Sequence, residues 1–139
     1  MKLVLDQAAV SALAAGPSNA QLQVRRAMTA AHRLRRDVTV PTVILAELYR
    51  GAGRNQMIDA LLSRETQALE LRDTDRVLAR LVGAVLSAAR AGSEDLADAH
   101  VVAAAVEAGG GIILTVDEAD LKRLADPYRT IVVEQLSSR

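Results

Sequence analysis

The fold of this chain is decided by the stretch Gly109-Gly110-Gly111-Ile112-Ile113-Leu114-Thr115-Val116-Asp117. Three successive glycines predict the end of a helix, and the apolar run that follows them predicts a short buried strand. A phosphate-binding glycine loop would follow a strand and open a helix, whereas these glycines precede the strand. The stretch is therefore interpreted as a helix stop, a buried strand and then a carboxylate, Asp117.

Similar short strands are expected elsewhere in the chain. Residues 3–5 form an apolar run that ends at Asp6, and residues 38–40 form a second run. Pro41 closes the second run and opens a helix that continues to Gly51. Weaker strand patterns lie at residues 68–71 and 131–133. The other predicted elements are a short helix ending before Gly16, helices at 18–34, 56–63, 74–91 and 93–109, and a short helix ending at Leu124. The tail Ser137-Ser138-Arg139 is expected to be frayed.

Strands that alternate with helices predict an α/β domain with a mainly parallel sheet. The chain has 139 residues, which predicts one domain spanning residues 1–139. It contains no Phe or Trp, so the core must consist of Leu, Val, Ile and Ala. It also contains no Cys and only two His, which excludes disulfides and thiolate metal sites and disfavours a histidine-rich zinc site.

The charge of the chain is balanced but uneven. The formal net charge is zero, yet five arginines fall between Arg25 and Arg36. Such a cluster is either a solvated helix face or a surface that binds phosphates or a partner, and Arg25, Arg26 and Arg33 are the candidates for that binding. The first apolar run is too short for a signal peptide, and no apolar stretch is long enough to span a membrane. A cytoplasmic protein is expected.

Four acidic residues occupy positions where a solvated charge is not expected. Asp6 and Asp117 follow predicted buried strands, while Glu47 and Asp98 lie beside apolar helix faces. Gathered carboxylates repel one another and lose hydration energy, and a divalent cation relieves both costs. The hypothesis is a metal-binding centre of Asp6, Glu47, Asp98 and Asp117, with Asp6 and Asp98 as ligands of a divalent cation.

Each acid also has a simpler interpretation. Asp6 fits a turn at a strand end, Glu47 fits an ion pair with Arg50, and Asp98 fits a first-turn acid of a helix. Asp117 fits a helix N-cap, with Asp120 at the third helical position. The joint pattern favours the metal site. Asp95, which precedes Asp98 by one turn, and Thr115, which ends a strand, are secondary candidates.

These residues resemble the PIN domains, and among them the VapC-type toxins of bacterial toxin–antitoxin pairs. Order and spacing match over essentially the whole chain. The matching segments are Leu3-Val4-Leu5-Asp6, the stretch from Pro41-Thr42-Val43-Ile44-Leu45-Ala46-Glu47 to Gly51, Asp98-Ala99-His100-Val101-Val102-Ala103-Ala104-Ala105 and Leu114-Thr115-Val116-Asp117.

The resemblance implies a single PIN-like domain with a parallel five-stranded sheet flanked by helices. It also implies Mg²⁺- or Mn²⁺-dependent cleavage of RNA, a small cognate antitoxin protein and a homodimer. Two positions depart from the family pattern: Gln7-Ala8 replace a small hydroxyl or amide residue after the first Asp, and Leu121 replaces a Phe. The first departure supports an alternative, a catalytically inactive PIN-like binding module. A receiver or haloacid-type phosphatase is disfavoured, because Ala8 stands where the latter requires a second Asp.

Overall fold

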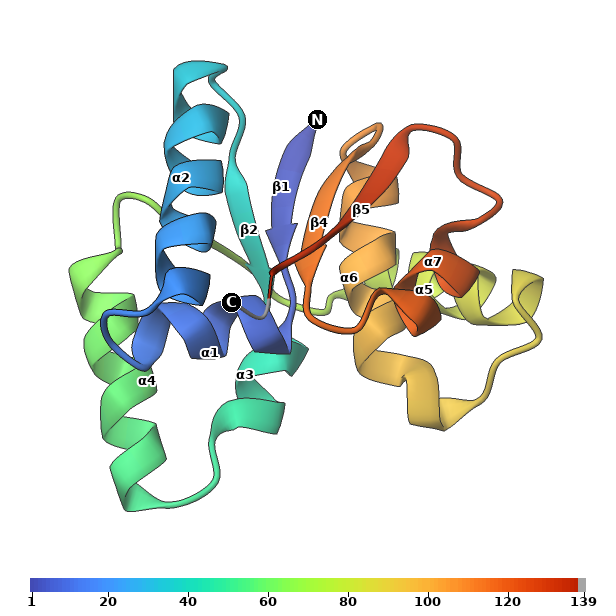
Figure 1. Cartoon of the computed structure of the whole chain (residues 1–139). Coiled ribbons are helices and arrows are strands. Elements are labelled where there is room, and N and C mark those ends of the chain that lie inside the picture. Colours follow the sequence, from blue (N-terminus) through green and yellow to red (C-terminus); the bar gives the residue numbers. More distant parts are fainter. Residues whose placement is uncertain (138–139) are drawn as a thin grey trace.

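The chain forms a five-stranded, all-parallel sheet in the order β3-β2-β1-β4-β5, as the computed structural model shows over residues 1–137 (Figure 1). The predicted fold class is confirmed. The strands are β1 (Lys2–Leu5), β2 (Val38–Pro41), β3 (Glu70–Arg72), β4 (Gly111–Thr115) and β5 (Ile131–Gln135). Strand β1 lies in the centre, where it pairs with β2 on one side and β4 on the other.

Helices cover the sheet on both faces (Figure 1). One face carries α1 (Gln7–Ala14), α2 (Asn19–Arg33) and α4 (Ala52–Arg64), and α3 (Thr42–Leu48) packs beside α1. The other face carries α6 (Leu96–Glu107), which packs against the sheet and is itself covered by α5 (Arg76–Ala88) and α7 (Glu118–Ala125). The 3₁₀ turn η1 (Ser93–Asp95) leads into α6. Helix α6 therefore lies between the sheet on one side and helices α5 and α7 on the other.

The core contains aliphatic side chains, as the composition required. Helix α6 is buried from Ala99 to Ala105, which explains its run of small and β-branched residues. Helices on a solvated face expose one side, whereas a helix packed on both sides must be apolar all round. The largest fully buried side chains include Leu5, Leu13, Ile44, Leu48, Leu61, Leu78, Ile113, Leu121 and Leu124.

The predicted strands and helices are all present, with shifted boundaries. The predicted strand at 68–71 lies at 70–72, and the helix predicted from Pro41 to Gly51 ends at Leu48. Tyr49 is extended and Gly51 has φ +115, so the chain turns there before α4. The glycine stop before β4 is confirmed, since Gly109 and Gly110 have φ +80 and +125.

The end of the described chain is held in place. Leu136 is buried, and its amide donates to the carbonyl of Thr115 at 2.7 Å. The Ser137 amide donates to Gln23 Oε1 at 2.8 Å, so Ser137 is not frayed. The rest of the tail predicted to be frayed, Ser138-Arg139, lies outside the described residues. Within residues 1–137, no helix is both long and apolar enough to cross a membrane.

Candidate metal centre

The acidic residues meet at the carboxyl edge of the sheet, where the strand order reverses. The chain leaves β1 toward one face and β4 toward the other, so the ends of these neighbouring strands flank a crevice. In open parallel sheets this switch point is the usual binding site. Asp6 follows β1, and Thr115 ends β4. The crevice is a hollow of about 190 Å³ whose lining includes Asp6, Asp98, Asp117 and Asp120.

Asp6 is the most deeply placed of these carboxylates, with an exposed fraction of 6%. It caps α1, because its Oδ1 accepts a hydrogen bond from the Ala9 amide at 3.0 Å. Burial raises the pKa of Asp6, and this effect outweighs the lowering by the Thr115 hydroxyl and by the backbone amides of Ala8 and Ala9. The cap fixes the position of this carboxylate in the lining of the crevice.

Asp98 lies in the first turn of α6 and is half-buried. Its pKa is raised to about 6, first by burial and then by the negative charges of Asp6, Asp120, Glu47 and Asp95. Five carboxylates from five different segments therefore share one electrostatic environment centred on Asp98. That arrangement is costly without a cation, since each carboxylate disfavours the ionisation of its neighbours.

A closer group lies within this set. Asp95, Asp98 and Asp120 each offer a carboxylate oxygen, and these oxygens lie within 4.8 Å of one another. Asp95 is buried and accepts a hydrogen bond from Arg123 Nη2 at 2.9 Å. Arg123, on α7, thus neutralises the charge of Asp95. The other two carboxylates of this group, Asp98 and Asp120, have less compensation for their charges.

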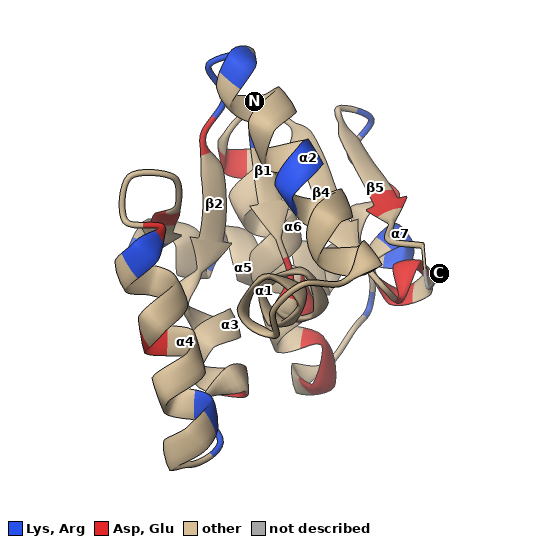
Figure 2. Cartoon of the chain, turned by 60° about the vertical axis from the view of Figure 1, so that its left-hand side comes forward, with Lys and Arg blue, Asp and Glu red and all other residues tan. Residues whose placement is uncertain are grey.

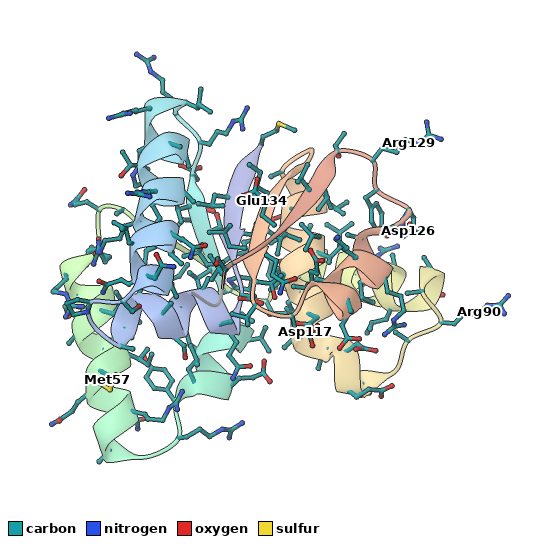
Figure 3. The ribbon with its side chains drawn as sticks, in the orientation of Figure 1. Met57, Arg90, Asp117, Asp126, Arg129 and Glu134 are labelled. Atoms are coloured by element: carbon teal, nitrogen blue, oxygen red, sulfur yellow. The ribbon has the colours of Figure 1, made fainter. Side chains whose placement is uncertain are left out.

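Asp117 has a different role from the one expected for a buried acid. It is exposed at the start of α7, where its Oδ1 accepts from the Ala119 amide at 3.3 Å (Figure 3). The Thr115 hydroxyl bonds both to the amide and to the carbonyl of Asp117, each at 3.1 Å. The expectation that Asp117 lies where a solvated charge is unfavourable is therefore wrong, and its N-cap interpretation is confirmed. It still lines the hollow.

The structure brings most of the predicted site residues together. Asp6, Glu47 and Asp98 share the crevice environment with Asp95, which was a secondary candidate. Asp120 faces Asp98 but was not among the predicted site residues. The signal was present in the sequence, because Asp120 follows Asp117 by three residues, and residues three apart lie on one side of a helix. His100 is buried with its Nδ1 on the Leu96 carbonyl at 2.8 Å, away from any relay with Asp98.

The predicted arginine contacts lie elsewhere. Arg25, Arg26 and Arg33 belong to α2, which starts beside α1 and ends near Asp37, whose carbonyl accepts from the Leu3 amide at the start of the sheet. Helix α2 therefore runs away from the acidic crevice toward the amino edge of the sheet. The structure does not bring Arg33 to the carboxylates.

The donor set fits a hard divalent cation. It consists of carboxylates, and oxygen ligands are those that Mg²⁺ and Mn²⁺ prefer. The carboxylate oxygens of Asp95, Asp98 and Asp120 lie close enough together to hold one ion, and Asp6 and Glu47 add negative charge at Asp98.

An all-parallel α/β domain with a carboxylate centre at its switch point defines the class of this protein. The family model described as PIN domain matches residues 3–127. The chain belongs to the PIN domain family.

Solved structures with the same fold include two VapBC complexes. One is VapBC2 from Rickettsia felis bound to a promoter DNA fragment, with 18% identity, TM-score 0.65, and coverage of 99% of this chain and 100% of that chain. The other is DNA-bound VapBC from Salmonella typhimurium, with 16% identity, TM-score 0.68 and coverage of 99% of both chains. A sequence comparison with curated proteins finds no match.

Proposed function

We propose that this PIN domain is a metal-dependent endoribonuclease and the toxin component of a toxin–antitoxin system. The observation that carries the proposal is the convergence of Asp6, Glu47, Asp95 and Asp120 on Asp98, whose pKa their charges and burial raise to about 6. Near neutral pH Asp98 is therefore mostly ionised and available as a ligand. A cation is the simplest compensation for such a cluster.

In this proposal the residues of the chain hold and orient the reacting groups. Asp6 and Asp98 bind the cation directly, and Glu47 and Asp120 bind it directly or through water. Bound Mg²⁺ or Mn²⁺ supplies activation of a water molecule and charge neutralisation at the leaving oxygen of a phosphodiester. Thr115 supports the strand end through its bonds to the Asp117 backbone. Arg123 holds Asp95 in place beside Asp98.

The partners belong to the same proposal. Both similar structures are VapBC complexes, and the sequence segments resemble VapC-type toxins. We therefore propose a small cognate antitoxin protein, a homodimer and a cytoplasmic location. We also propose that residues 1–139 form one domain, because β5 follows the last residue of the family match and still pairs with β4.

The alternative is a catalytically inactive binding module. Gln7 and Ala8 line the acidic hollow in place of the small hydroxyl or amide residue that the resemblance leads one to expect. Hydrogen-bond partners behind metal ligands orient those ligands, so this departure is the observation that favours the alternative.

Cleavage of RNA in the presence of Mn²⁺ tests the proposal. Glu47→Gln keeps the shape of the side chain and removes its charge, and it should reduce cleavage by about 10- to 100-fold if the glutamate serves the metal. Glu134→Gln is the matched control, because Glu134 is exposed on β5. Equal cleavage by the two variants would remove Glu47 from the site.

The melting temperature provides a readout that is independent of turnover. A ligand that binds the native state alone stabilises it by about 2.7 kcal/mol at 100 times its Kd. Mn²⁺ should raise the melting temperature of the wild type and of Glu134→Gln, and Glu47→Gln should diminish the rise. A wild type that neither melts higher with Mn²⁺ nor cleaves RNA would favour the inactive module.

A further inference from the structure

One segment of this chain carries basic side chains without any acidic ones. Residues 7–36 contain five arginines and no acidic residue, so the rest of the chain carries five more acidic than basic side chains. In Figure 2 the blue segments of α2 and of the turn that follows it lie on the face turned toward the viewer. The arginine face, as we define it, consists of Arg26, Arg33, Arg35 and Arg36 with the neighbouring Arg25.

These arginines are largely uncompensated. Arg25 forms an ion pair with Glu65 at 2.9 Å. The other four form no side-chain hydrogen bond or ion pair with any part of residues 1–137. Arg26, Arg33 and Arg35 are exposed. A shallow hollow of about 450 Å³ lies among the side chains of Leu22, Arg25, Arg26, Thr29, Ala30 and Arg33.

Arg35 stands where the backbone favours glycine. Its φ is +57, and it ends α2 with a bond from its own amide to the His32 carbonyl at 3.0 Å and one from the Arg36 amide to the Ala31 carbonyl at 2.8 Å. This is the helix-ending pattern in which glycine is commonest, because a side chain in the left-handed region is strained. Arg35 therefore costs the fold stability that a glycine at the same position would provide.

The arginine face and the acidic crevice lie apart. Helix α2 has 15 residues, or about 22 Å at the rise of an α-helix. It begins beside α1 and ends at the amino edge of the sheet, whereas the carboxylates lie at the opposite edge. The carboxylates at the carboxyl edge therefore repel a phosphate backbone unless a cation lies between them. The arginines toward the amino edge attract it.

We propose that the arginine face binds the phosphodiester backbone of a nucleic acid outside the segment that is cut. The identity of this nucleic acid as RNA substrate rests on the proposed function. Arginines spaced along a helix match successive phosphates as charge partners, and such binding weakens linearly with the logarithm of salt concentration. Distant contacts add affinity without entering the chemistry at the carboxylates.

A pair of glycine substitutions separates binding from folding. Arg90 is exposed, has φ +52 and ends α5 with the same two bonds, from the Arg90 amide to Ser87 and from the Ala91 amide to Leu86. Figure 3 shows its side chain extended away from the molecule. Arg35→Gly and Arg90→Gly should each raise the melting temperature by about 2–4 °C, because both relieve a left-handed residue.

Only Arg35→Gly should weaken binding. The probe is a single-stranded oligonucleotide of mixed sequence, followed by fluorescence anisotropy in EDTA so that cleavage does not intervene. Arg35→Gly should lose affinity and reduce the slope of log affinity against log salt by about 1 or less, as expected for one phosphate contact. A more stable variant with weaker binding cannot be explained by damage to the fold. Equal binding by the two variants would overturn the proposal.

A second variant extends the test to the whole face. A variant with Gln in place of Arg26, Arg33 and Arg35 should reduce the slope of log affinity against log salt by roughly 2 to 3. Oligonucleotides of the same sequence, made as RNA and as DNA, show which nucleic acid the protein prefers. If the triple variant still bound the RNA and the DNA oligonucleotide as the wild type does, the proposal would be overturned. The arginine face would then be a solvated surface or a site for an acidic protein. The proposed function fails separately, if the wild type binds the oligonucleotide but does not cut RNA with Mn²⁺.

Discussion

Asp98 makes the stability of the metal-free protein depend on pH. Its pKa is about 6 in the folded chain against 3.8 as the ordinary value. The folded state thus holds the proton more tightly than the unfolded state, so this contribution to stability is full below pH about 4 and is lost as the pH rises through about 6. The raised pKa of Asp6 acts in the same direction.

In EDTA the wild type should therefore lose more melting temperature than Asp98→Asn between about pH 5 and about pH 7.5. Asp98→Asn should also melt above the wild type at the higher pH, because one of the repelling charges is gone. Thermal melts of both proteins at the two pH values provide the measurement. Parallel pH dependence of the two would show that Asp98 ionises normally.

Asp120 and Asp117 give contrasting expectations at one helix start. Asp120→Asn removes a charge that faces Asp98, so it should weaken the Mn²⁺-induced rise in melting temperature. Asp117→Asn keeps the cap of α7, because Asn caps about as well as Asp, and it should change the free energy of unfolding by less than about 0.5 kcal/mol. Its cleavage rate decides whether Asp117 acts in catalysis as the sequence suggested.

Single residues also show where sequence reasoning reaches its limit. Asp6 and Asp98 were identifiable because each is attached to an apolar run whose burial is predictable. Asp120 could be placed on the same side of its helix as Asp117, but its approach to Asp98 depends on how α7 packs beside α6, and no local pattern encodes that packing. Arg123, which pairs with Asp95 from a different helix, is a case of the same kind.

Gly111 in β4 and Gly83 in α5 differ in whether the structure has room for a side chain. A Cβ added to Gly111 would overlap the backbone carbonyl of Lys2, its partner on the adjacent strand β1. A Cβ at Gly83, in α5, meets nothing within 4 Å. Gly111→Ala should therefore lower the free energy of unfolding by about 1–3 kcal/mol. Gly83→Ala should raise it by about 0.5–1 kcal/mol through reduced freedom of the unfolded chain. Urea unfolding of the two variants is the measurement, and equal effects would contradict the close approach of β1 and β4.

The sequence pattern predicted which helices and strands exist better than it predicted where each begins and ends. The strand at 111–115 was legible because five residues in succession are apolar or small and follow a glycine stop. The break between α3 and α4 was predicted at Gly51, but α3 already ends at Leu48, because Tyr49 leaves the helix through its extended backbone and no proline or capping side chain marks that position. The arginine-rich helix was predicted, but its direction relative to the site follows from the sheet order.

At the scale of the whole molecule, the segment after β5 contributes a buried side chain to the core. Leu136 has an exposed fraction of 4%, while Val132 on β5 has one of 52%. Leu136→Ala should lower the free energy of unfolding by about 2–4 kcal/mol, as for other buried leucines. Val132→Ala should cost roughly 0.5 kcal/mol or less. If the two variants unfold at the same denaturant concentration, the segment after β5 does not contribute to the core.

The central place of β1 determines when the site first exists during protein synthesis. Its partner β4 is made about a hundred residues later, since Lys2 pairs with Gly111. A nascent chain that stops before β4 already carries Asp6, Glu47 and Asp98, but one side of its first strand is unpaired and the crevice has no second wall. Such contacts between distant segments form late in folding. Incomplete translation products of this protein should therefore lack the assembled carboxylate site, which first forms when translation is almost finished.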